Sequence, residues 1–397
     1  MSAIDYDVAI AGGGLVGAAL GALLLRHGRV EPRRVLLLER DWVESPAAGA
    51  PLDLRVSAYS GASRQLLIDA DAWRRLDAAR VCPYERMQVW HEGSAPDSAD
   101  SLRFDAAEIA AADLGAIIEN RAVQAALLAA YVEAGGQVRR ERLTQLVQEP
   151  GAVAITSESG VCRARLLVGA DGAASQVRNL AGIASREASY GERAIVALIR
   201  SAQPHRATAW QNFLSTGPLA LLPMADGHCS IVWSALDAES ARLMALDEAA
   251  FNRALTRASG GALGELALAS ERLVFPLRRI AAERYVSGRC ALVGDAAHVI
   301  HPLAGQGVNQ GLLDAAALCR AIGARPARED VAAPRVLRAY ERERRSGNAL
   351  MGAVVDQIDA VFKGPPGLAG RFAREGLGLV ARSAALRQFF ARQANGS

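Results

Sequence analysis

The stretch Tyr6-Asp7-Val8-Ala9-Ile10-Ala11-Gly12-Gly13-Gly14-Leu15-Val16-Gly17 decides the fold of this 397-residue chain. Its first six residues form a mostly apolar run with β-branched side chains, which predicts a strand, and the uncharged residues 18–25 predict a helix. Between them the pattern G-x-G-x-x-G falls on Gly12, Gly14 and Gly17. Glycines there allow a tight turn, close approach of the backbone to a pyrophosphate, and tight packing of helix on strand. The sequence therefore predicts a dinucleotide-binding turn whose phosphates meet the N-terminus of the helix.

A second predicted strand, residues 34–38, ends at Glu39, which lies 22 residues after Gly17. An acid at this place can accept hydrogen bonds from the hydroxyls of a ribose. The alternative is an ordinary solvated acid at the end of a strand. Because a glutamate stands here rather than a basic cluster, the pattern argues against a 2′-phosphate on the nucleotide. It leaves NAD and FAD equally open.

The composition is typical of a globular protein of roughly two to three domains. Hydrophobic residues make up 51% of the chain, and the formal net charge is only +3. So small a charge does not favour nucleic acid as a partner. The five cysteines are scattered and form no C-x-x-C pair, which predicts free, buried thiols in a reducing compartment.

Residues 8–25 carry no charge over 18 positions, which is the length of a transmembrane candidate. We reject a membrane span because five of these 18 residues are glycines and the pattern changes from strand to helix within the segment. Asp5 and Asp7 also stand where a signal peptide carries basic residues. The expected location is therefore cytoplasmic.

The middle of the chain alternates helical and strand-like patterns. Residues 63–76 and 237–259 have helical spacing, and Asn120 is suited as the N-cap of a helix over residues 121–134. Several strand-like runs crowd the region from about Tyr190 to Pro276. They predict a mostly antiparallel sheet that is inserted between parts of the nucleotide-binding domain and could floor a ligand cavity. Candidate wall residues are Trp210, Phe213, Leu219, Leu221, Trp233 and Phe275, although each of them taken singly is expected in the core rather than against a ligand.

A second glycine-rich turn follows the apolar residues 290–293 and extends from Gly294-Asp295 to Gly307. His298 and His301 within it could share one face of a helix, since they are three residues apart. There is no third ligand cluster nearby, however, and Pro302 follows directly. We therefore expect both histidines to make structural hydrogen bonds and expect no metal site.

Three motifs together resemble the signature set of the FAD-dependent aromatic hydroxylases related to para-hydroxybenzoate hydroxylase. They are residues 12–17, Asp171-Gly172 with Ser175 and Arg178, and Gly294-Asp295 with Pro302. Within that class, residues 53–58, 119–121 and 294–309 most resemble the ubiquinone-biosynthesis hydroxylases, the UbiH/UbiF/VisC group. The similarity extends over nearly the whole chain.

The resemblance implies an α/β fold with a three-layer, Rossmann-like FAD-binding domain, an inserted, mostly antiparallel β-sheet domain for the substrate, and C-terminal helices. The FAD-binding domain is expected to comprise residues 1–80, 101–185 and 282–345. The substrate domain is expected to comprise residues 81–100 and 186–281. Residues 346–397 are expected to form the helical region.

The resemblance also implies which residues hold FAD. Gly12, Gly14 and Gly17 would meet the pyrophosphate, Glu39 the adenosine ribose, and Asp295 the ribityl chain. A carboxylate suits that last task because it accepts charge-assisted hydrogen bonds from hydroxyls, although a helix N-cap is the alternative role for Asp295. Further cofactor contacts implied by the resemblance are Leu15, Val16, Arg40, Arg55, Arg121, Asp171, Val308 and Asn309. Surface exposure is the alternative for the two arginines Arg55 and Arg121.

Near the flavin ring, the resemblance places Pro302 beside the ring and the turn Gly305-Gln306-Gly307 against its pyrimidine edge. Backbone N–H groups at the start of a helix would there stabilise negative charge on the reduced ring. Glycines suit the turn because a side chain would block so close an approach. No residue is assigned as a general base, and His228 is available without further support.

The implied reaction hydroxylates the ring of a polyprenylated phenol or quinol intermediate of ubiquinone biosynthesis. NADH or NADPH would reduce FAD, O2 would add at flavin C4a, and the hydroperoxide would deliver a hydroxyl group to the ring. No separate nicotinamide domain is visible, which matches the class but leaves the electron donor open. The alternatives are another flavoprotein on the same scaffold, such as a monooxygenase of a soluble aromatic compound or a reductase, and a non-catalytic flavin-binding subunit that organises other ubiquinone enzymes.

The C-terminal residues 363–397 contain six basic residues and one acid, interleaved with apolar side chains. This amphipathic basic pattern suits the anionic surface of a membrane. Because a polyprenylated substrate resides in the bilayer, we expect peripheral contact with the inner membrane or with other ubiquinone-biosynthesis proteins. A helix packed on its own domain or on a partner is the alternative, and a homo-oligomer is left open.

Overall fold

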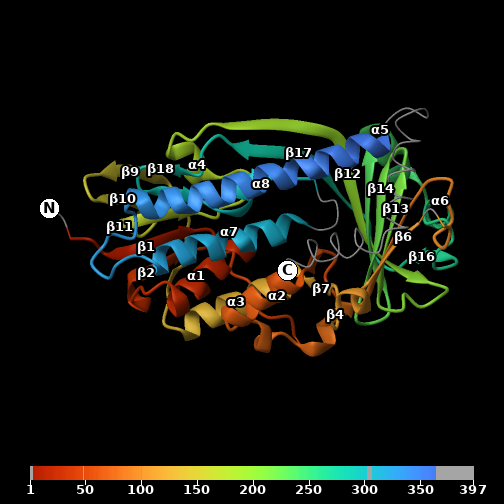
Figure 1. Ribbon diagram of the computed structural model, residues 1–397, viewed down its shortest axis with the longest axis horizontal. Coiled ribbons are helices and arrows are strands. Elements are labelled where there is room, and N and C mark those ends of the chain that lie inside the picture. The colour runs from red at the N-terminus through yellow and green to blue at the C-terminus, as the bar shows by residue number, and fades with distance from the viewer. Residues whose placement is uncertain (1–2, 48, 100, 302–305, 364–397) are drawn as a thin grey trace.

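Two large sheets lie toward opposite ends of an elongated molecule in the computed structural model, which describes residues 3–47, 49–99, 101–301 and 306–363 (Figure 1). The long helix α8 (Pro334–Lys363) extends from the first sheet to the second. A small sheet of three strands, in the order β3-β7-β4, completes the described β-structure. Its strands are β3 (Val56–Tyr59), β4 (Val81–Tyr84) and β7 (Gly115–Glu119).

Strand β1 (Tyr6–Ala11) is central to the first sheet because it pairs in parallel with both β2 (Val35–Leu38) and β11 (Gly160–Gly169). Ile10 lies opposite Leu37 on one side and Val168 on the other, and all three are fully buried. Such uninterrupted burial is typical of parallel strands covered on both faces. The strand order is β18-β19-β11-β1-β2-β8, with β10 and β9 added at β11. The other strands are β8 (Gln137–Arg139), β9 (Gln145–Glu149), β10 (Ala152–Ser157), β18 (Val286–Ser287) and β19 (Cys290–Leu292).

Helix α1 (Leu15–His27) packs against both α3 (Asn120–Glu133) and α7 (Gln306–Gly323), and α7 packs in turn against α8. This arrangement places the start of α1 close to the start of α7, although nearly 300 residues separate them in the chain. The shorter helices of this part are α2 (Gly61–Asp69) and α4 (Gln176–Leu180). No helix in the described ranges is both long and apolar enough to cross a membrane.

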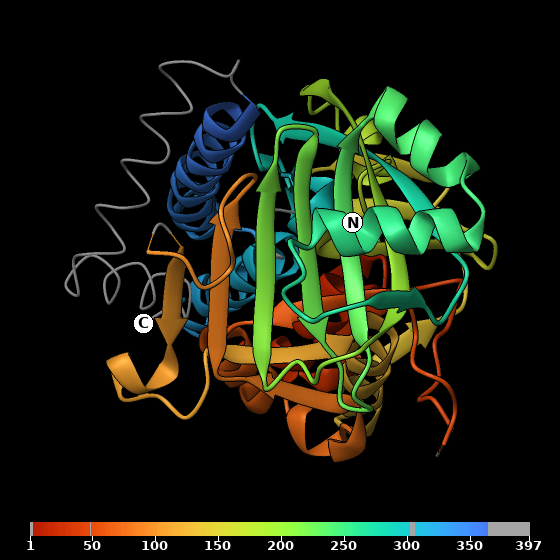
Figure 2. The same cartoon turned by 90° about the vertical axis from the view of Figure 1, so that its right-hand side faces the viewer.

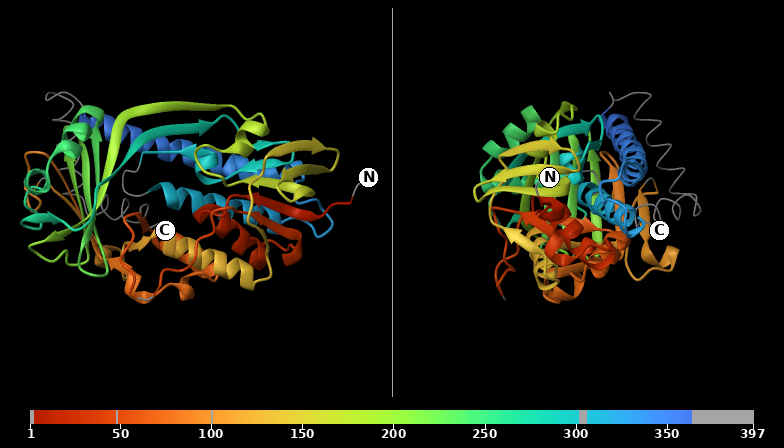
Figure 3. Two further views of the ribbon diagram at one scale, coloured as in Figure 1. Left: turned by 180° about the vertical axis from the view of Figure 1, so that it is seen from behind. Right: turned by 90° about the vertical axis from the view of Figure 1, so that its left-hand side faces the viewer.

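The second sheet has the order β20-β17-β12-β15-β14-β13-β5-β6 and is antiparallel except where β13 runs parallel to β5. Helices α5 (Asp237–Ala245) and α6 (Glu248–Ala258) cover its outer face (Figure 2). Strands β12 (Ser185–Ser201) and β17 (Leu273–Ala282) form a long ribbon that leads from this sheet back toward the first (Figure 3). The remaining strands are β5 (Arg86–His91), β6 (Leu102–Asp105), β13 (Thr208–Leu214), β14 (Gly217–Pro223), β15 (Cys229–Leu236), β16 (Leu266–Leu268) and β20 (His298–Val299).

The predicted α/β fold class is confirmed, and so are the free, buried cysteines, since all five thiols are unpaired and buried. Two helix predictions were wrong in detail. The helix expected over residues 237–259 is divided into α5 and α6, because Asp247 caps α6 by accepting a hydrogen bond from the Ala250 N–H at 2.7 Å. The helix expected over residues 63–76 begins two residues earlier and ends at Asp69, and residues 73–75 form a separate 3-10 turn.

Asn120 is not an N-cap. Helix α3 begins at Asn120 itself and follows Glu119, which makes no side-chain cap. The Asn120 side chain instead accepts a hydrogen bond from the Tyr59 hydroxyl at 3.3 Å. Glu119 is equally engaged elsewhere, because its carboxylate forms a buried ion pair with Arg80 at 2.7 Å. The helix start is therefore stabilised by tertiary contacts rather than by the local cap that the sequence suggests.

Candidate functional site

The first glycine turn is shaped by packing at two glycines and is open at the third. A Cβ atom on Gly12, which has φ +102°, would come within 2.4 Å of the Ala170 carbonyl oxygen, and one on Gly17 within 1.9 Å of the Gly12 oxygen. A Cβ on Gly14 would meet nothing within 4 Å. The start of α1 has no side-chain cap and no acid in its first turn. Its N–H groups at Leu15 and Val16 therefore face an open cradle of the kind that holds a phosphate.

Glu39, at the end of β2, lies against this turn. Its Oε2 accepts a hydrogen bond from the Gly13 N–H at 2.6 Å, and its Oε1 accepts one from the Asp41 N–H at 2.8 Å. The carboxylate is thus held beside the glycine turn, where the family resemblance predicts the adenosine ribose. The next residue, Arg40, is exposed and forms a surface ion pair with Asp41 at 3.4 Å.

The two glycine-rich turns contact each other through one side chain. Val16 on α1 packs against Gly294, where an added Cβ would come within 3.0 Å of Val16 Cγ2. At Gly311 on α7 an added Cβ would come within 2.5 Å of the same methyl carbon. The absence of side chains at both glycines therefore allows the start of α1 and the second turn to lie side by side. A single ligand can contact both turns.

Asp295 lies in a short 3-10 turn, η5 (Gly294–Ala296), and lines a cavity. The residue is exposed by its accessible surface and lines the cavity, while neighbouring protein atoms displace part of its hydration. Burial raises the pKa of this carboxyl, and the charges of His298 and Arg55 partly oppose that change. An acid whose pKa is perturbed in a cavity is a candidate ligand-binding group.

A buried polar network supports the turn that carries Asp295. Asp314 on α7 is fully buried and accepts hydrogen bonds from the Gly294 N–H at 3.0 Å and from His298 Nε2 at 2.5 Å. Its other oxygen accepts from Arg344 Nε at 2.6 Å and from Asn348 Nδ2 at 3.0 Å, both on α8. Burial opposes ionisation of Asp314, but His298 and Arg344 outweigh it and lower its pKa. The network therefore connects α7 and α8 to the turn beneath the cavity.

Sequence reasoning missed this network. The signal that could have revealed it is the isolated charge of Asp314, which is the only charged residue between positions 306 and 319. A buried charge in such a setting requires a partner. Its partners Arg344 and Asn348 lie about 30 residues further on, and no local pattern identifies them.

The motif at Asp171-Gly172 is connected to the same turn. The Asp171 carboxylate accepts hydrogen bonds from the Ser175 hydroxyl at 2.5 Å and from the Gln176 N–H at 2.7 Å. Arg178, which is 3% exposed, donates to the Ala296 carbonyl at 2.9 Å and thereby joins this loop to η5. Asp171 thus shapes its own loop, and the contact with cofactor expected of it stays a prediction.

Residues 302–305 of the second turn are not described, so the expected residues Pro302 and Gly305 lie outside the described residues. Gly307 and Val308 line the cavity, and a Cβ on Gly307 would meet nothing within 4 Å. Asn309 is buried and contacts the protein rather than the cavity. Its Nδ2 donates to the Ala58 carbonyl at 2.9 Å, and its Oδ1 accepts from the Ser63 hydroxyl at 2.6 Å. It fastens α7 to β3 and α2.

The two arginines expected near the flavin are both exposed, and neither lines the cavity. The Arg55 guanidinium lies 5.7 Å from the centre of the Phe275 ring, and its charge acts on Asp295. Arg121 lies in the first turn of α3. Both arginines therefore lie at the surface, and only the charge of Arg55 acts on a residue of the site, Asp295.

His298 and His301 do not share a helical face, because residues 298–299 form strand β20. His298 binds Asp314, whereas His301 is fully buried and lies 3.0 Å from Glu192 Oε2 on β12. Each histidine therefore has its own carboxylate partner, as expected for structural hydrogen bonds. Across the described ranges, no group of three or more His, Cys, Asp or Glu side chains is arranged to hold a metal ion.

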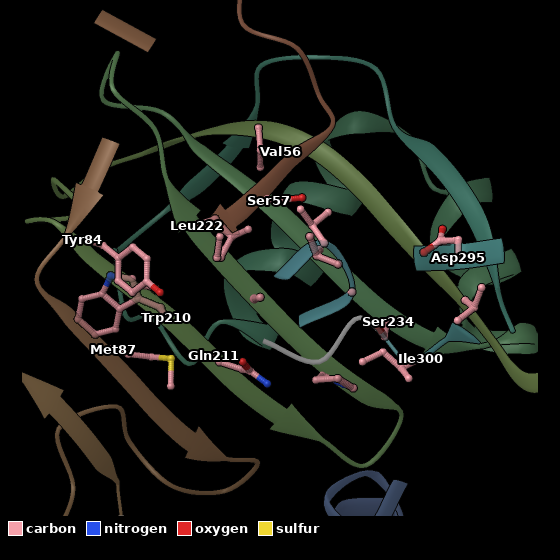
Figure 4. Close-up of a pocket in the computed structure, with 18 residues that line it drawn as sticks. Val56, Ser57, Tyr84, Met87, Trp210, Gln211, Leu222, Ser234, Asp295 and Ile300 are labelled. Carbon is pink, nitrogen blue, oxygen red and sulfur yellow. The ribbon is translucent and has the colours of Figure 1, made fainter. Parts of the chain in front are cut away.

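A cavity of about 270 Å³ lies between the second turn and the inner face of the second sheet (Figure 4). On one side it is lined by β3, Asp295, Ile300 and the start of α7. On the other side it is lined by the sheet. The sheet residues are Met87, Ala209, Trp210, Gln211, Pro218, Ala220, Leu222, Val232 and Ser234.

Most of the candidate wall residues lie in core clusters, which is the alternative that the sequence favoured for each of them. Leu219, Leu221 and Trp233 belong to the core beneath α5 and α6, on the outer face of the sheet. Their neighbours Ala220, Leu222 and Val232 face the cavity instead, because successive side chains of a strand point to opposite faces. Phe213 packs in a separate cluster, and Phe275 is 38% exposed. Of the six predicted residues, Trp210 lines the cavity.

Comparison with known proteins identifies the family of the chain. The profile of the family described as "FAD binding domain" matches residues 5–353. The ubiquinone hydroxylase UbiL of Rhodospirillum rubrum is 37% identical over 98% of this chain and 90% of its own length. The 3-demethoxyubiquinol 3-hydroxylase of Escherichia coli is 36% identical over 94% of both chains. The chain belongs to the FAD-dependent ubiquinone-biosynthesis hydroxylases. Its predicted cofactor, FAD, and its predicted class, an aromatic-ring hydroxylase, are thereby confirmed.

Solved structures show the same fold as this ubiquinone-biosynthesis hydroxylase. The p-nitrophenol 4-monooxygenase PnpA from Pseudomonas putida DLL-E4 superposes with a TM-score of 0.76 over 99% of this chain and 98% of its own, at 19% identity. PqsL of P. aeruginosa in complex with 2-aminobenzoylacetate superposes with a TM-score of 0.75 over 94% of this chain and 99% of its own, at 23% identity. At these identities the comparison establishes the fold, and the roles of individual residues stay predictions.

Proposed function

We propose that this hydroxylase acts on the aromatic ring of a polyprenylated phenol or quinol intermediate of ubiquinone biosynthesis, with O2 and a reduced nicotinamide as co-substrates. The observation that carries the proposal is the cavity, which has the second glycine-rich turn on one side and a mainly apolar sheet on the other. The names of the relatives in Rhodospirillum rubrum and Escherichia coli point to ubiquinone intermediates as substrates. Substrates of this kind would fit an apolar cavity next to a flavin.

The residues of the site fit FAD. The open space at Gly14 and the uncapped start of α1 would hold the pyrophosphate, and Glu39, with Arg40 at the rim, would face the adenosine ribose. Asp295 would bind the hydroxyls of the ribityl chain. The chemistry that FAD supplies when bound is the transfer of two electrons from the reduced nicotinamide and the activation of O2.

The chain itself contributes positioning, charge and the exclusion of water. The N–H groups at the start of α7, at Gly307 and Val308, would stabilise negative charge at the edge of the reduced ring system. Ala220, Leu222 and Val232 exclude water from the opposite wall, which protects a reactive oxygen species from decay. We propose that residues 1–80, 101–185 and 282–345 hold FAD and that residues 81–100 and 186–281 hold the substrate.

The electron donor in this proposal is NADH or NADPH, which docks transiently. We propose that residues 363–397 mediate peripheral contact with an anionic membrane surface, because they contain six basic residues and one acid. A polyprenylated substrate would enter from that surface. Contact of the same segment with other ubiquinone-biosynthesis proteins is the competing outcome.

The decisive experiment is lipid extraction from a strain that lacks this gene. We expect a prenylated precursor that lacks one ring hydroxyl to accumulate and the wild-type gene to restore ubiquinone. The accumulated precursor also identifies the ring position.

With purified protein, FAD, NADH or NADPH and 18O2, one labelled oxygen atom should enter the ring of the product. Normal quinone content in the deletion strain would refute the proposed function. Restoration of ubiquinone by a variant that binds FAD but cannot hydroxylate would instead indicate a non-catalytic flavin-binding subunit.

A further inference from the structure

Two polar side chains stand in the otherwise apolar sheet wall of the cavity. Gln211 on β13 is 8% exposed and Ser234 on β15 is 2% exposed, and both line the cavity (Figure 4). Within the described part of the chain, neither side chain has a hydrogen-bond partner in the protein. Buried polar groups in folded proteins are nearly always paired, so two such groups aimed into one cavity indicate a ligand that pairs with them.

The register of the sheet sets how these two groups are spaced. Strand β14 lies between β13 and β15, so that Gln211 is opposite Ala220 and Ala220 is opposite Val232. Ser234 is two residues beyond Val232 on the same face of β15. The two polar groups are therefore separated by two strand spacings across the sheet and by two residues along it, or roughly 12 Å, and cannot bond to each other directly. The small side chain of Ala220 leaves room above the strand between them.

We propose that Gln211 and Ser234 bind oxygen substituents on two sides of the substrate ring and thereby select and orient it. A planar ring lying over Ala220 can present one oxygen to the amide of Gln211 and another to the hydroxyl of Ser234. Gln211 and Ser234 can each both donate and accept hydrogen bonds, so each can pair with a hydroxyl, a carbonyl or an ether oxygen. Asp295, Gly307 and Val308 line the opposite side of the same cavity. The inference rests on the proposed function and adds the residues that determine which ring is held, and in which orientation.

The test uses the FAD-loaded enzyme and three probes with decreasing oxygen content: a prenylated catechol, a prenylated phenol and prenylbenzene. The variants Gln211→Met and Ser234→Ala remove one polar group each with little change of shape. Ser230→Ala is the matched control, because Ser230 lies on the same strand and the same face as Ser234 but outside the cavity lining. Dissociation constants come from the change in flavin absorbance on titration.

We expect the wild-type enzyme to prefer the catechol over prenylbenzene by at least roughly 30-fold, because a site with unpaired polar groups rejects a ligand that lacks the matching oxygens. In each variant the ratio of the dissociation constants of prenylbenzene and the catechol should fall roughly 5- to 10-fold. The dissociation constant of prenylbenzene itself should stay within about twofold of wild type. Both variants should also release more H2O2 per nicotinamide oxidised, since a loosely held ring intercepts less of the activated oxygen.

Equal weakening of all three probes would show that the two residues are merely structural. An unchanged preference would show that they bind only water. Either outcome overturns the inference. Failure of the proposed function is recognised separately, because the wild-type enzyme would then leave the catechol and the phenol without a new hydroxyl and the deletion strain would contain normal ubiquinone.

Discussion

Asp295 places a carboxyl group where the surrounding protein disfavours its charged form, although the residue is exposed along the cavity wall. Burial raises the pKa of its carboxyl, against the opposing influence of His298 and Arg55. A carboxylate held in this way is a strong acceptor for the hydroxyl groups of a ligand, and it lowers the stability of the ligand-free protein. An N-cap would not need this arrangement, because a neutral side chain caps a helix as well.

The first prediction follows for the variant Asp295→Asn. We expect FAD affinity to fall roughly tenfold or more, because charge-assisted hydrogen bonds to the ribityl hydroxyls are lost. In the wild type, affinity should decrease as pH falls through the raised pKa, whereas the asparagine variant should show little dependence on pH. The ligand-free variant should melt slightly above the ligand-free wild type, since the raised pKa means that the folded state disfavours the charged form. Fluorescence titration of FAD over a series of pH values and thermal melts measure these effects, and unchanged FAD affinity would refute the assignment.

Single residues also show where sequence reasoning ends. The role of Gly17 in packing could be predicted, because its close neighbour is Gly12 within the same local pattern, whereas Gly12 itself packs against the distant Ala170. Asn309 was expected to contact the cofactor, yet its amide binds Ala58, 251 positions away in the chain. The partner of a polar side chain depends on which distant segment folds against it. A local pattern does not contain that information.

At the scale of elements, α1 and α7 meet through Val16, Gly294 and Gly311. The contact places the starts of both helices on the same side of the first sheet. The positive ends of two helix dipoles thereby converge on one region, which suits a cofactor with a pyrophosphate and a reducible ring.

The second prediction tests this contact with Gly311→Ala. The new methyl group would lie 2.5 Å from Val16 Cγ2, so the helices must separate. We expect a loss of about 1–3 kcal/mol in the free energy of unfolding and weaker binding of FAD. Adding Val16→Ala should restore most of both, because it removes the clashing methyl group. Denaturant titration of the two single variants and the double variant measures the coupling, and strictly additive effects would contradict a direct contact.

The third prediction concerns the network that joins α7 and α8. Arg344→Met leaves the buried carboxylate of Asp314 without its arginine, which should lower the free energy of unfolding by about 3 kcal/mol or more.

The pKa of Asp314 is lowered in the folded protein, so its contribution to stability is present above the ordinary pKa of about 4 and is lost as pH falls below it. The stability advantage of the wild type over Asp314→Asn should therefore shrink on acidification. Chemical unfolding at a series of pH values tests this, and an advantage that grows toward low pH would be inconsistent with it.

The second sheet shows why strands could be predicted but not the face that lines the cavity. Period-two alternation indicates that Leu219 and Leu221 share one face and that Ala220 and Leu222 share the other. Both faces of these strands carry apolar residues, because α5 and α6 cover one face and the cavity lies against the other. Only the position of the helices distinguishes the two faces.

At the scale of the whole molecule, the cavity is built from both large parts of the structure. The first sheet and its helices form one core cluster, the second sheet with α5 and α6 forms another, and the cavity is lined by residues that flank both. The α/β class could be predicted because the strand-turn-helix pattern around Gly12 is local. The position of the cavity could not, because it depends on how β3, α7 and the second sheet come together.

The last prediction concerns the basic C-terminal segment, and its outcome separates membrane contact from a structural role. Deletion of residues 364–397 removes five of the six basic residues and leaves the cavity lining and both glycine turns intact. Each basic residue near an anionic surface contributes about 1 kcal/mol to binding, so the truncated protein should lose most of its affinity for vesicles that contain anionic lipid. Its FAD content and its rate with a short-chain, water-soluble phenol should stay within about twofold of the full chain, while its rate with a long-chain substrate in vesicles should fall. A charge-matched variant with the five arginines replaced by lysine should bind vesicles like the wild type, since the attraction depends on charge. Sedimentation of the truncated protein with vesicles at wild-type levels would assign the segment to contact with a partner protein or with its own domain instead.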